Sequence, residues 1–158
     1  VPGGTALGTG HGEVVSPVLA RPASWHWVVA IADEGLSTPA VYRELDRLRE
    51  APNPPAPVGS ADALLAALRQ RDPAVLGASL GNDLQPAALS LRPALAEVLK
   101  AGHTAGALAG LVSGSGPTCV FLAADGGDAE RIAGVLEAAG VCRAAWTAHG
   151  PVAGARVV

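Results

Sequence analysis

Apolar and polar positions along the chain fall into short continuous apolar runs and longer amphipathic stretches. The run 24–32 is rich in β-branched and aromatic residues and ends at a polar Asp-Glu-Gly turn, which predicts a strand. Trp25 and Trp27 would share one face of this strand and His26 the other, because side chains alternate along a strand. His26 has the chemistry of a catalytic base, but an edge or surface position is the more common setting for such a histidine.

Two more apolar runs, 105–112 and 119–124, predict a hairpin around the turn Ser113-Gly114-Ser115-Gly116, which Pro117 closes. Glycine permits backbone angles that other residues resist, and it allows another backbone or an anion to come close. Consecutive N–H groups in such a turn can form a concave nest for phosphate oxygens. An ordinary hairpin turn is the alternative, because glycine is common in turns of every kind.

Apolar residues three and four positions apart predict several helices between and after these strands. The first begins with Thr38 as N-cap and Pro39 in the first helical position, and a proline-rich loop over 51–59 follows it. Four more helices are expected before the hairpin: over 61–70, from Asp72 to near Gly81, after Pro86, and from Pro93 to about Gly102. After the hairpin, a helix is expected over 129–139, with Ile132, Val135 and Leu136 facing inward. A last strand is expected over 141–148.

The glycine-rich segment 3–13 predicts a strand and a turn, and His11 within it is expected to be an exposed loop residue. The remaining elements follow the order strand, helices, strand, strand, helix, strand. This is the order of the split βαβ, or ferredoxin-like, plan of the α+β class, an antiparallel sheet with helices on one face. Here a helical insertion enlarges the first connection.

Composition argues against several classes of function. The chain has 158 residues, enough for one domain with a proper core, and its net charge of −3 without a basic cluster argues against nucleic-acid binding. No apolar run reaches membrane-spanning length. Cys119 and Cys142 lack metal-ligand spacing, so we expect free thiols in a reducing cytoplasm and no metal site.

Spacing alone reveals no catalytic constellation. Ser113 and Ser115 have no His and Asp nearby in the sequence to activate them, and no Walker-type phosphate loop is present. Asn82 and Asp83 are expected only to mark the boundary between two helices. The residues by themselves therefore indicate an α+β domain with one potential anion-binding turn.

Five stretches, in the same order along the chain, resemble the carboxy-terminal domain of the GHMP small-molecule kinases. The central stretch LVSGSGPT, 111–118, resembles the third motif of that superfamily. Within the superfamily, the chain resembles the kinases that act on 4-diphosphocytidyl-2-C-methyl-D-erythritol in the non-mevalonate isoprenoid pathway. The supporting stretches are GGTAL (3–7) with GHGE (10–13), LSTPAVY (36–42), NDLQ (82–85) and GAL (106–108).

The resemblance implies transfer of the γ-phosphoryl group of ATP, with Mg²⁺, to a hydroxyl of the diphosphocytidyl-methylerythritol substrate. It places the ATP-binding loop and the catalytic Lys and Asp in an amino-terminal half, so no catalytic residue is expected in this chain. Residues 1–23 would be the end of that half or an interdomain segment, and 24–158 the carboxy-terminal domain. With no Met and a Val1-Pro2 start, the chain is expected to be a fragment that is inactive alone.

The resemblance also implies binding roles for particular residues. Thr38 would hydrogen-bond the substrate near its diphosphate, and Tyr42 would stack on the cytosine ring. The turn Ser113–Gly116 would support the phosphate-binding loop of the missing half through backbone N–H groups. A plain N-cap at Thr38 and a packing role for Tyr42 remain alternatives, since helix rules place both residue types there. Gln85 departs from the family's Glu, and His11 from its Arg.

Two other functions remain open from the sequence. Another GHMP kinase, acting on homoserine or mevalonate-type molecules, would share the fold and the glycine-rich turn. The other is a stand-alone ferredoxin-like binding or regulatory module that is not part of an enzyme. A glycine-rich phosphate loop and a Lys/Asp pair in the upstream coding sequence would favour the kinase.

Overall fold

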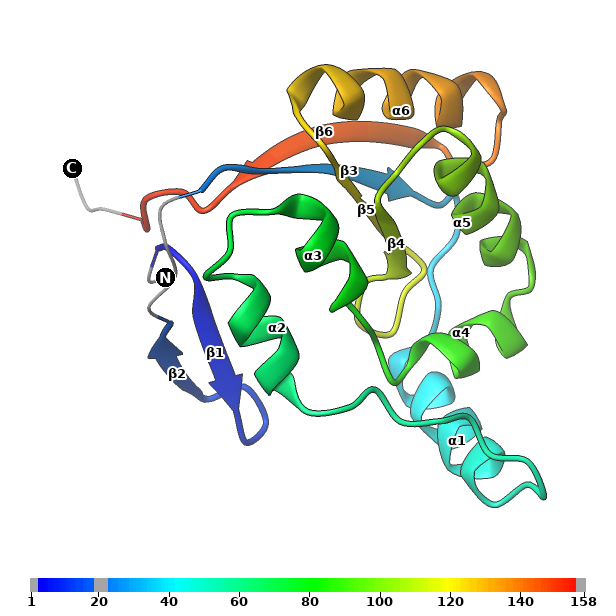
Figure 1. Ribbon diagram of the computed structural model, residues 1–158. Helices are drawn as coiled ribbons and strands as arrows, with labels where there is room; N and C mark the ends of the chain where they lie inside the picture. Colours follow the sequence, from blue (N-terminus) through cyan, green and yellow to red (C-terminus); the bar gives the residue numbers. More distant parts are fainter. Residues whose placement is uncertain (1–2, 19–22, 156–158) are drawn as a thin grey trace.

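A four-stranded antiparallel sheet forms the centre of the molecule (Figure 1). The computed structural model describes residues 3–18 and 23–155, so the Val1-Pro2 start and the end of the tail lie outside the described residues. The strands of this sheet are β3 (Trp25–Ile31), β4 (Ala109–Val112), β5 (Cys119–Ala123) and β6 (Ala144–Gly150). Their spatial order is β4-β5-β3-β6, and each neighbouring pair is antiparallel.

Five helices connect β3 to β4, and one helix connects β5 to β6. In chain order they are α1 (Thr38–Arg49), α2 (Ala61–Ala67), α3 (Pro73–Ala78), α4 (Gln85–Leu91), α5 (Ala94–Thr104) and α6 (Gly126–Ala138). This order confirms the predicted ferredoxin-like fold class with an enlarged first connection. Helices α2 and α3 end earlier, and β6 begins later, than predicted. Within the described residues, no helix combines the length and apolar character that a bilayer crossing requires.

Helices cover both faces of the sheet, whereas the sequence predicted helices on one. On one face, α5 and α6 pack over Val28 and Phe121, which have no exposed surface. On the other face, α2 and α3 pack over Trp25 and Leu122. Trp27 pairs with Leu122, and Val28 with Phe121, so the two sets of side chains alternate along β3 and β5. The inserted helices therefore bury the second face of the sheet (Figure 1).

Phe121 is the largest fully buried side chain among the described residues, and two glycines make room for its ring. A Cβ on Gly102 of α5 would overlap the ring, and a Cβ on Gly110 of β4 would lie 2.6 Å from its Cδ1. Both backbones therefore approach the aromatic ring more closely than any residue with a side chain could. This close approach fixes the position of α5 on the sheet.

The junction between α5 and β4 lies later in the sequence than predicted. The helix continues through Gly102 to Thr104, and Gly106, with φ +92°, reverses the chain. The Ala107 N–H donates to the Gly102 carbonyl over 3.0 Å, a bond typical of a helix that ends at a glycine. The predicted strand 105–112 is therefore shortened to β4.

Helix α6 begins earlier than predicted because Asp125 caps it. The Asp125 carboxylate accepts a hydrogen bond from the Asp128 N–H at 2.9 Å, so the predicted polar turn is the first turn of the helix. Ile132 and Leu136 are buried as predicted, whereas Val135 is 41% exposed. The inward face of α6 is therefore narrower than its apolar pattern indicated.

A second, two-stranded sheet lies beside the domain, at the lower left of Figure 1. It consists of β1 (Ala6–Thr9) and β2 (Val14–Pro17), and every residue of both strands is exposed. The Gly4 N–H donates to the Val152 carbonyl at 2.9 Å, which ties this hairpin to the carboxy-terminal tail. The sequence predicted the first strand and the turn but not the second strand.

Helix α1 is held against α4 by an apolar cluster and by Glu44. The Glu44 carboxylate accepts hydrogen bonds from the Arg47 guanidinium at 2.7 and 2.8 Å and from the Ser90 hydroxyl of α4 at 2.5 Å. The bonds from Arg47, and then that from Ser90, stabilise the ionised form and lower the pKa of Glu44 to about 2. The carboxylate therefore joins the two helices in its charged state.

We expect Gly102→Ala to destabilise the protein, although glycine-to-alanine changes within helices usually stabilise. The new methyl group would overlap the Phe121 ring in a filled core, which costs about 1–3 kcal/mol. Gly134→Ala in α6 is the matched control, because its Cβ would meet nothing within 4 Å and a gain of roughly 0.5–1 kcal/mol is expected. Urea unfolding measures both free energies, and changes of the same sign would contradict this packing.

We also expect acid to remove the stabilisation that Glu44 supplies. Its folded-state pKa of about 2 lies below the ordinary value of 4.5, so this contribution is present above pH 4.5 and is lost as the pH falls toward 2. The stability of Glu44→Gln should therefore depend less on pH across that window. Glu130→Gln, at an exposed position of α6, is the control. Urea midpoints that fall equally steeply in Glu44→Gln and the unmodified protein would refute this role.

Candidate functional site

The turn Ser113–Gly116 joins β4 to β5 and has a compact, defined backbone. The Ser113 N–H donates to the Thr118 carbonyl at 2.8 Å, and the Gly116 N–H donates to the Ser113 carbonyl at 2.9 Å. Gly114 and Gly116 have φ values of +57° and +79°, which favour glycine. Within residues 3–18 and 23–155, the N–H groups of Gly114 and Ser115 donate no hydrogen bond. The turn can therefore offer two N–H groups to an anion.

Thr38 lies against this turn, although 77 positions separate it from Ser115 in the sequence. The Thr38 and Ser115 hydroxyl oxygens are 2.8 Å apart, within hydrogen-bond distance. Thr38 is the first residue of α1, and Ser37 occupies the N-cap position without a side-chain capping bond. The predicted N-cap role of Thr38 is therefore wrong, and its hydroxyl faces the glycine-rich turn instead.

Tyr42 follows Thr38 by one helical turn, so both side chains project from the same side of α1. The Tyr42 side chain is 54% exposed, whereas Val41 and Leu45 on the inner face of the helix are buried. The aromatic ring is thus accessible beside the hydroxyl pair of Thr38 and Ser115. With this exposure, a packing role for Tyr42 would be limited to contacts on one side of the ring.

Asn82 contacts the turn and Gln85 contacts the strand end that precedes it, and the sequence did not assign either residue to the site. The Asn82 side-chain amide donates to the Val112 and Gly114 carbonyls, and the Gln85 side-chain carbonyl accepts from the Val112 N–H. The prediction that Asn82 only marks a helix boundary is therefore incomplete. The one signal that could have indicated these residues was the NDLQ stretch, which fits a helix boundary equally well.

The histidine and cysteine candidates occupy other elements. His11 lies exposed in the turn between β1 and β2. His26 lies partly buried on β3, an inner strand, whereas the sequence favoured an edge or surface position. Burial raises the pKa of the Cys119 thiol to about 12, so it stays protonated and unreactive. Across the described part of the chain, no three His, Cys, Asp or Glu side chains are grouped to hold a metal ion.

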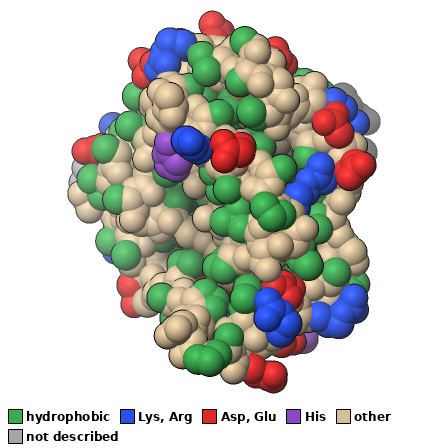
Figure 2. Space-filling view, turned by 90° about the vertical axis from the view of Figure 1, so that its right-hand side faces the viewer, with side chains coloured by type: hydrophobic (Ala, Val, Ile, Leu, Met, Phe, Trp, Pro, Cys, Tyr) green, Lys and Arg blue, Asp and Glu red, His purple; other side chains and the backbone are tan. Residues whose placement is uncertain are grey.

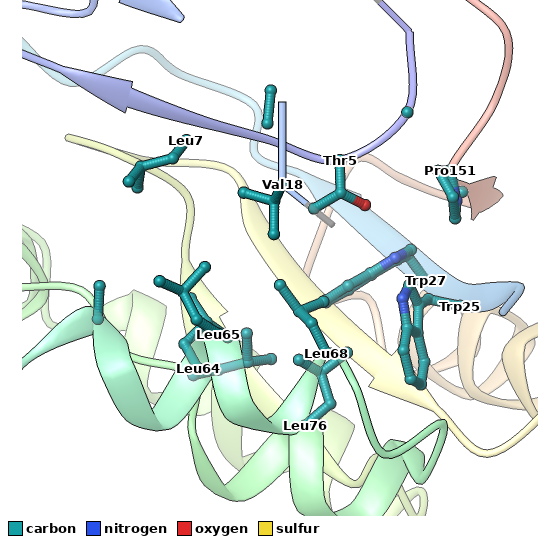
Figure 3. Close-up of a pocket in the computed structure, with 15 residues that line it drawn as sticks. Thr5, Leu7, Val18, Trp25, Trp27, Leu64, Leu65, Leu68, Leu76 and Pro151 are labelled. Atoms are coloured by element: carbon teal, nitrogen blue, oxygen red, sulfur yellow. The ribbon is translucent and has the colours of Figure 1, made fainter. Parts of the chain in front are cut away.

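An apolar cleft of about 400 Å³ lies between the β1–β2 hairpin, β3 and helix α2 (Figure 3). Trp25 and Trp27 line it from the sheet, and Leu64 and Leu65 line it from α2, while Thr5 supplies a hydroxyl from the hairpin. None of the predicted site residues is in its lining. A phosphate-bearing ligand requires convergent polar groups, so this cleft is a poor candidate for the phosphate site.

Charged side chains of both signs are scattered among apolar ones on the face shown in Figure 2. Neither basic nor acidic side chains gather into a large patch on this face. Binding of a charged ligand on this face would therefore depend on a few directed hydrogen bonds rather than on a broad electrostatic field.

Over nearly its whole length, the chain is similar to kinases of one kind. It is 75% identical over 155 residues to the 4-diphosphocytidyl-2-C-methyl-D-erythritol kinase of Salinispora arenicola (strain CNS-205), covering 98% of this chain and 49% of that protein. It is 57% identical over 156 residues to the kinase of the same name from Mycobacterium tuberculosis (strain ATCC 25177 / H37Ra), covering 99% and 48%. The chain spans about half the length of the curated relatives it matches.

Solved structures share the fold. A crystal structure of 4-(cytidine 5'-diphospho)-2C-methyl-D-erythritol kinase matches with a TM-score of 0.66 and 33% identity, covering 91% of this chain and 48% of that one. A homoserine kinase from Cytophaga hutchinsonii matches with a TM-score of 0.67 at 20% identity, covering 96% and 49%, which shows the fold alone. The sequence model described as GHMP kinases C terminal matches residues 64–142, half of the chain. The chain therefore belongs to the GHMP kinase C-terminal family.

Proposed function

We propose that this chain is the substrate-side half of an ATP-dependent kinase that phosphorylates 4-diphosphocytidyl-2-C-methyl-D-erythritol, an isoprenoid precursor. The 2.8 Å contact between the Thr38 and Ser115 hydroxyls carries this proposal, because it joins the predicted substrate helix to the predicted phosphate-side turn. Relatives that bear this enzyme name, at 57% and 75% identity, support the choice of substrate.

The turn Ser113–Gly116 would serve the phosphate side of the reaction. Phosphoryl transfer consists largely of positioning the reacting groups and stabilising charge on the phosphate oxygens. The N–H groups of Gly114 and Ser115 are suited to this task, since backbone donors in a turn with positive φ values converge on an anion. In the complete enzyme, the turn would support the ATP phosphate loop of the upstream half.

Helix α1 would serve the substrate side. The Thr38 hydroxyl would bond the substrate near its diphosphate, and the exposed ring of Tyr42 would stack on the cytosine base. An exposed aromatic ring one helical turn from a hydroxyl can contact a nucleobase and its diphosphate together. This spacing supports a cytidine nucleotide over a smaller substrate such as homoserine.

The remaining machinery would come from the upstream half. We assign ATP and Mg²⁺ binding, and the catalytic Lys and Asp, to that half, so this chain alone would not turn over substrate. Half of each curated relative lies beyond its match to this chain, which leaves room for such a domain. The free thiols Cys119 and Cys142 fit a reducing compartment, and we place the enzyme in the cytoplasm.

Residues 1–23 would belong to the end of the upstream half or to the segment between the halves. Both strands of the β1–β2 hairpin are exposed throughout, and Val14 and Val15 are 52% and 47% exposed. A two-stranded sheet is at best marginally stable in water unless further strands or a helix pack on it. These features support an assignment in which the upstream half packs on the hairpin.

We expect ATP-dependent phosphorylation by the chain joined to its upstream half, and none by the chain alone, because the catalytic groups lie upstream. The assay measures ATP consumption with 4-diphosphocytidyl-2-C-methyl-D-erythritol, and with homoserine and mevalonate as matched controls. Turnover by the chain alone would refute the division into halves. Preference for a control substrate would indicate another GHMP kinase, and inactivity of both proteins would favour a binding module.

The same two proteins test the assignment of the hairpin. Hydrogen exchange at the Val14 and Val15 amides should slow when the upstream half is joined, because their backbones would become covered. Equal exchange in the two proteins would place the hairpin outside the interface between the halves.

We expect Tyr42→Ala to raise the KM for the cytidyl substrate about tenfold or more, because base stacking contributes roughly 1–3 kcal/mol. Tyr42→Phe retains the ring and is the control, with a KM close to that of the unmodified enzyme. The KM for ATP should change little in either variant. Steady-state kinetics on the joined protein provide these values, and a normal substrate KM in Tyr42→Ala would exclude the stacking role.

A further inference from the structure

Strand β4 lies at an edge of the described sheet, and its last residue, Val112, has backbone groups that β5 does not satisfy. The Val112 N–H donates to the Gln85 Oε1 at 2.9 Å, and the Val112 carbonyl accepts from the Asn82 Nδ2 at 2.7 Å. Two side chains thus bond the N–H and the carbonyl of one residue, as a neighbouring strand would.

Asn82 extends this arrangement into the turn. Its Nδ2 also donates to the Gly114 carbonyl at 2.8 Å, so one amide group bridges the end of β4 and the glycine-rich turn. Its Oδ1 accepts from the Leu84 N–H at 3.0 Å, which fixes the orientation of the amide. Because only Asp83 and Leu84 separate Asn82 from α4, the turn is attached close to the start of that helix.

The hydrogen bonds to the Val112 backbone matter for stability because Val112 has no exposed surface. Its N–H and carbonyl have little access to water, and a buried backbone group without a partner is strongly disfavoured. The bonds from Asn82 and Gln85 therefore stabilise the position of the strand end. The position of this strand end determines the direction in which the chain enters the turn.

We propose that Asn82 and Gln85 are positioning residues that hold the Ser113–Gly116 turn in the conformation that serves the ATP phosphates. Neither residue is assigned to touch the reacting atoms. The N–H groups of Gly114 and Ser115 stay available because the Gly114 carbonyl is held by Asn82 on the other side of the turn. The kinetic part of this inference rests on the proposed kinase function, whereas the structural part does not.

One side-chain amide acts as a hydrogen-bond donor and the other as an acceptor, so the same kind of substitution should affect them differently. Asn82 acts on the turn as a donor through Nδ2, while Gln85 acts as an acceptor through Oε1. An amide-to-carboxylate exchange removes donors but keeps acceptors. Asn82→Asp should therefore release the turn, whereas Gln85→Glu should retain it. Gln85→Leu removes the acceptor and should release the Val112 N–H.

The structural readout is residue-resolved hydrogen exchange by NMR. We expect the Ser113 and Gly116 amides to exchange about tenfold faster or more in Asn82→Asp, which loses both bonds that Asn82 donates, and at unchanged rates in Gln85→Glu. The Val112 amide should exchange faster in Gln85→Leu. Asp83→Ala is the control in the same segment, since the Asp83 carboxylate accepts from the Val58 N–H at 2.7 Å and is not bonded to the turn.

The kinetic readout uses the chain joined to its upstream half. We expect Asn82→Asp to raise the KM for ATP about tenfold and Gln85→Glu to leave it unchanged, because phosphate binding depends on the turn. A loss of folded protein alone would lower kcat without changing KM. Unchanged exchange and KM in Asn82→Asp, or equal damage from Gln85→Glu, would overturn the proposal. Faster exchange in Asn82→Asp, combined with no kinase activity in the unmodified joined protein, would support the structural role and refute the proposed function instead.

Discussion

The buried backbone of Val112 is the constraint on which the arrangement of the site depends. Its N–H and carbonyl are bonded by Gln85 and Asn82 at the start of α4, so the end of β4 and the start of that helix are fixed together. Helix α4 then holds α1 through Ser90 and Glu44. Helix α1 returns to the turn through Thr38 and Ser115, which closes a ring of contacts.

This ring lies at one end of a sheet whose two faces are filled independently. Phe121 packs against glycines on one face, where α5 and α6 lie. Trp25 and Leu122 pack under α2 and α3 on the other. Because dense cores resist displacement, both faces give the turn a rigid base.

Local patterns in the sequence predicted much of the fold, because the helices and strands follow periods of apolar residues. The errors fall where tertiary contacts override local signals. Gly102 resembled a helix end, but it is a site of close packing against Phe121. His26 resembled an edge residue, but β6 pairs with β3 and makes that strand an inner one. The second helical layer was not predicted, because the sequences of α2 and α3 do not indicate which face of the sheet these helices pack on.

The sequence by itself determined the order of the elements, the glycine-rich turn and the presence of Thr38 and Tyr42 on one helix, because these depend on neighbouring residues. Only the tertiary structure decided that Thr38 faces Ser115 rather than capping its helix, since that contact spans 77 positions. It also decided that Asn82 is a bridge to the turn. Hydrogen bonds between distant segments depend on how the chain packs, and no local pattern encodes that packing.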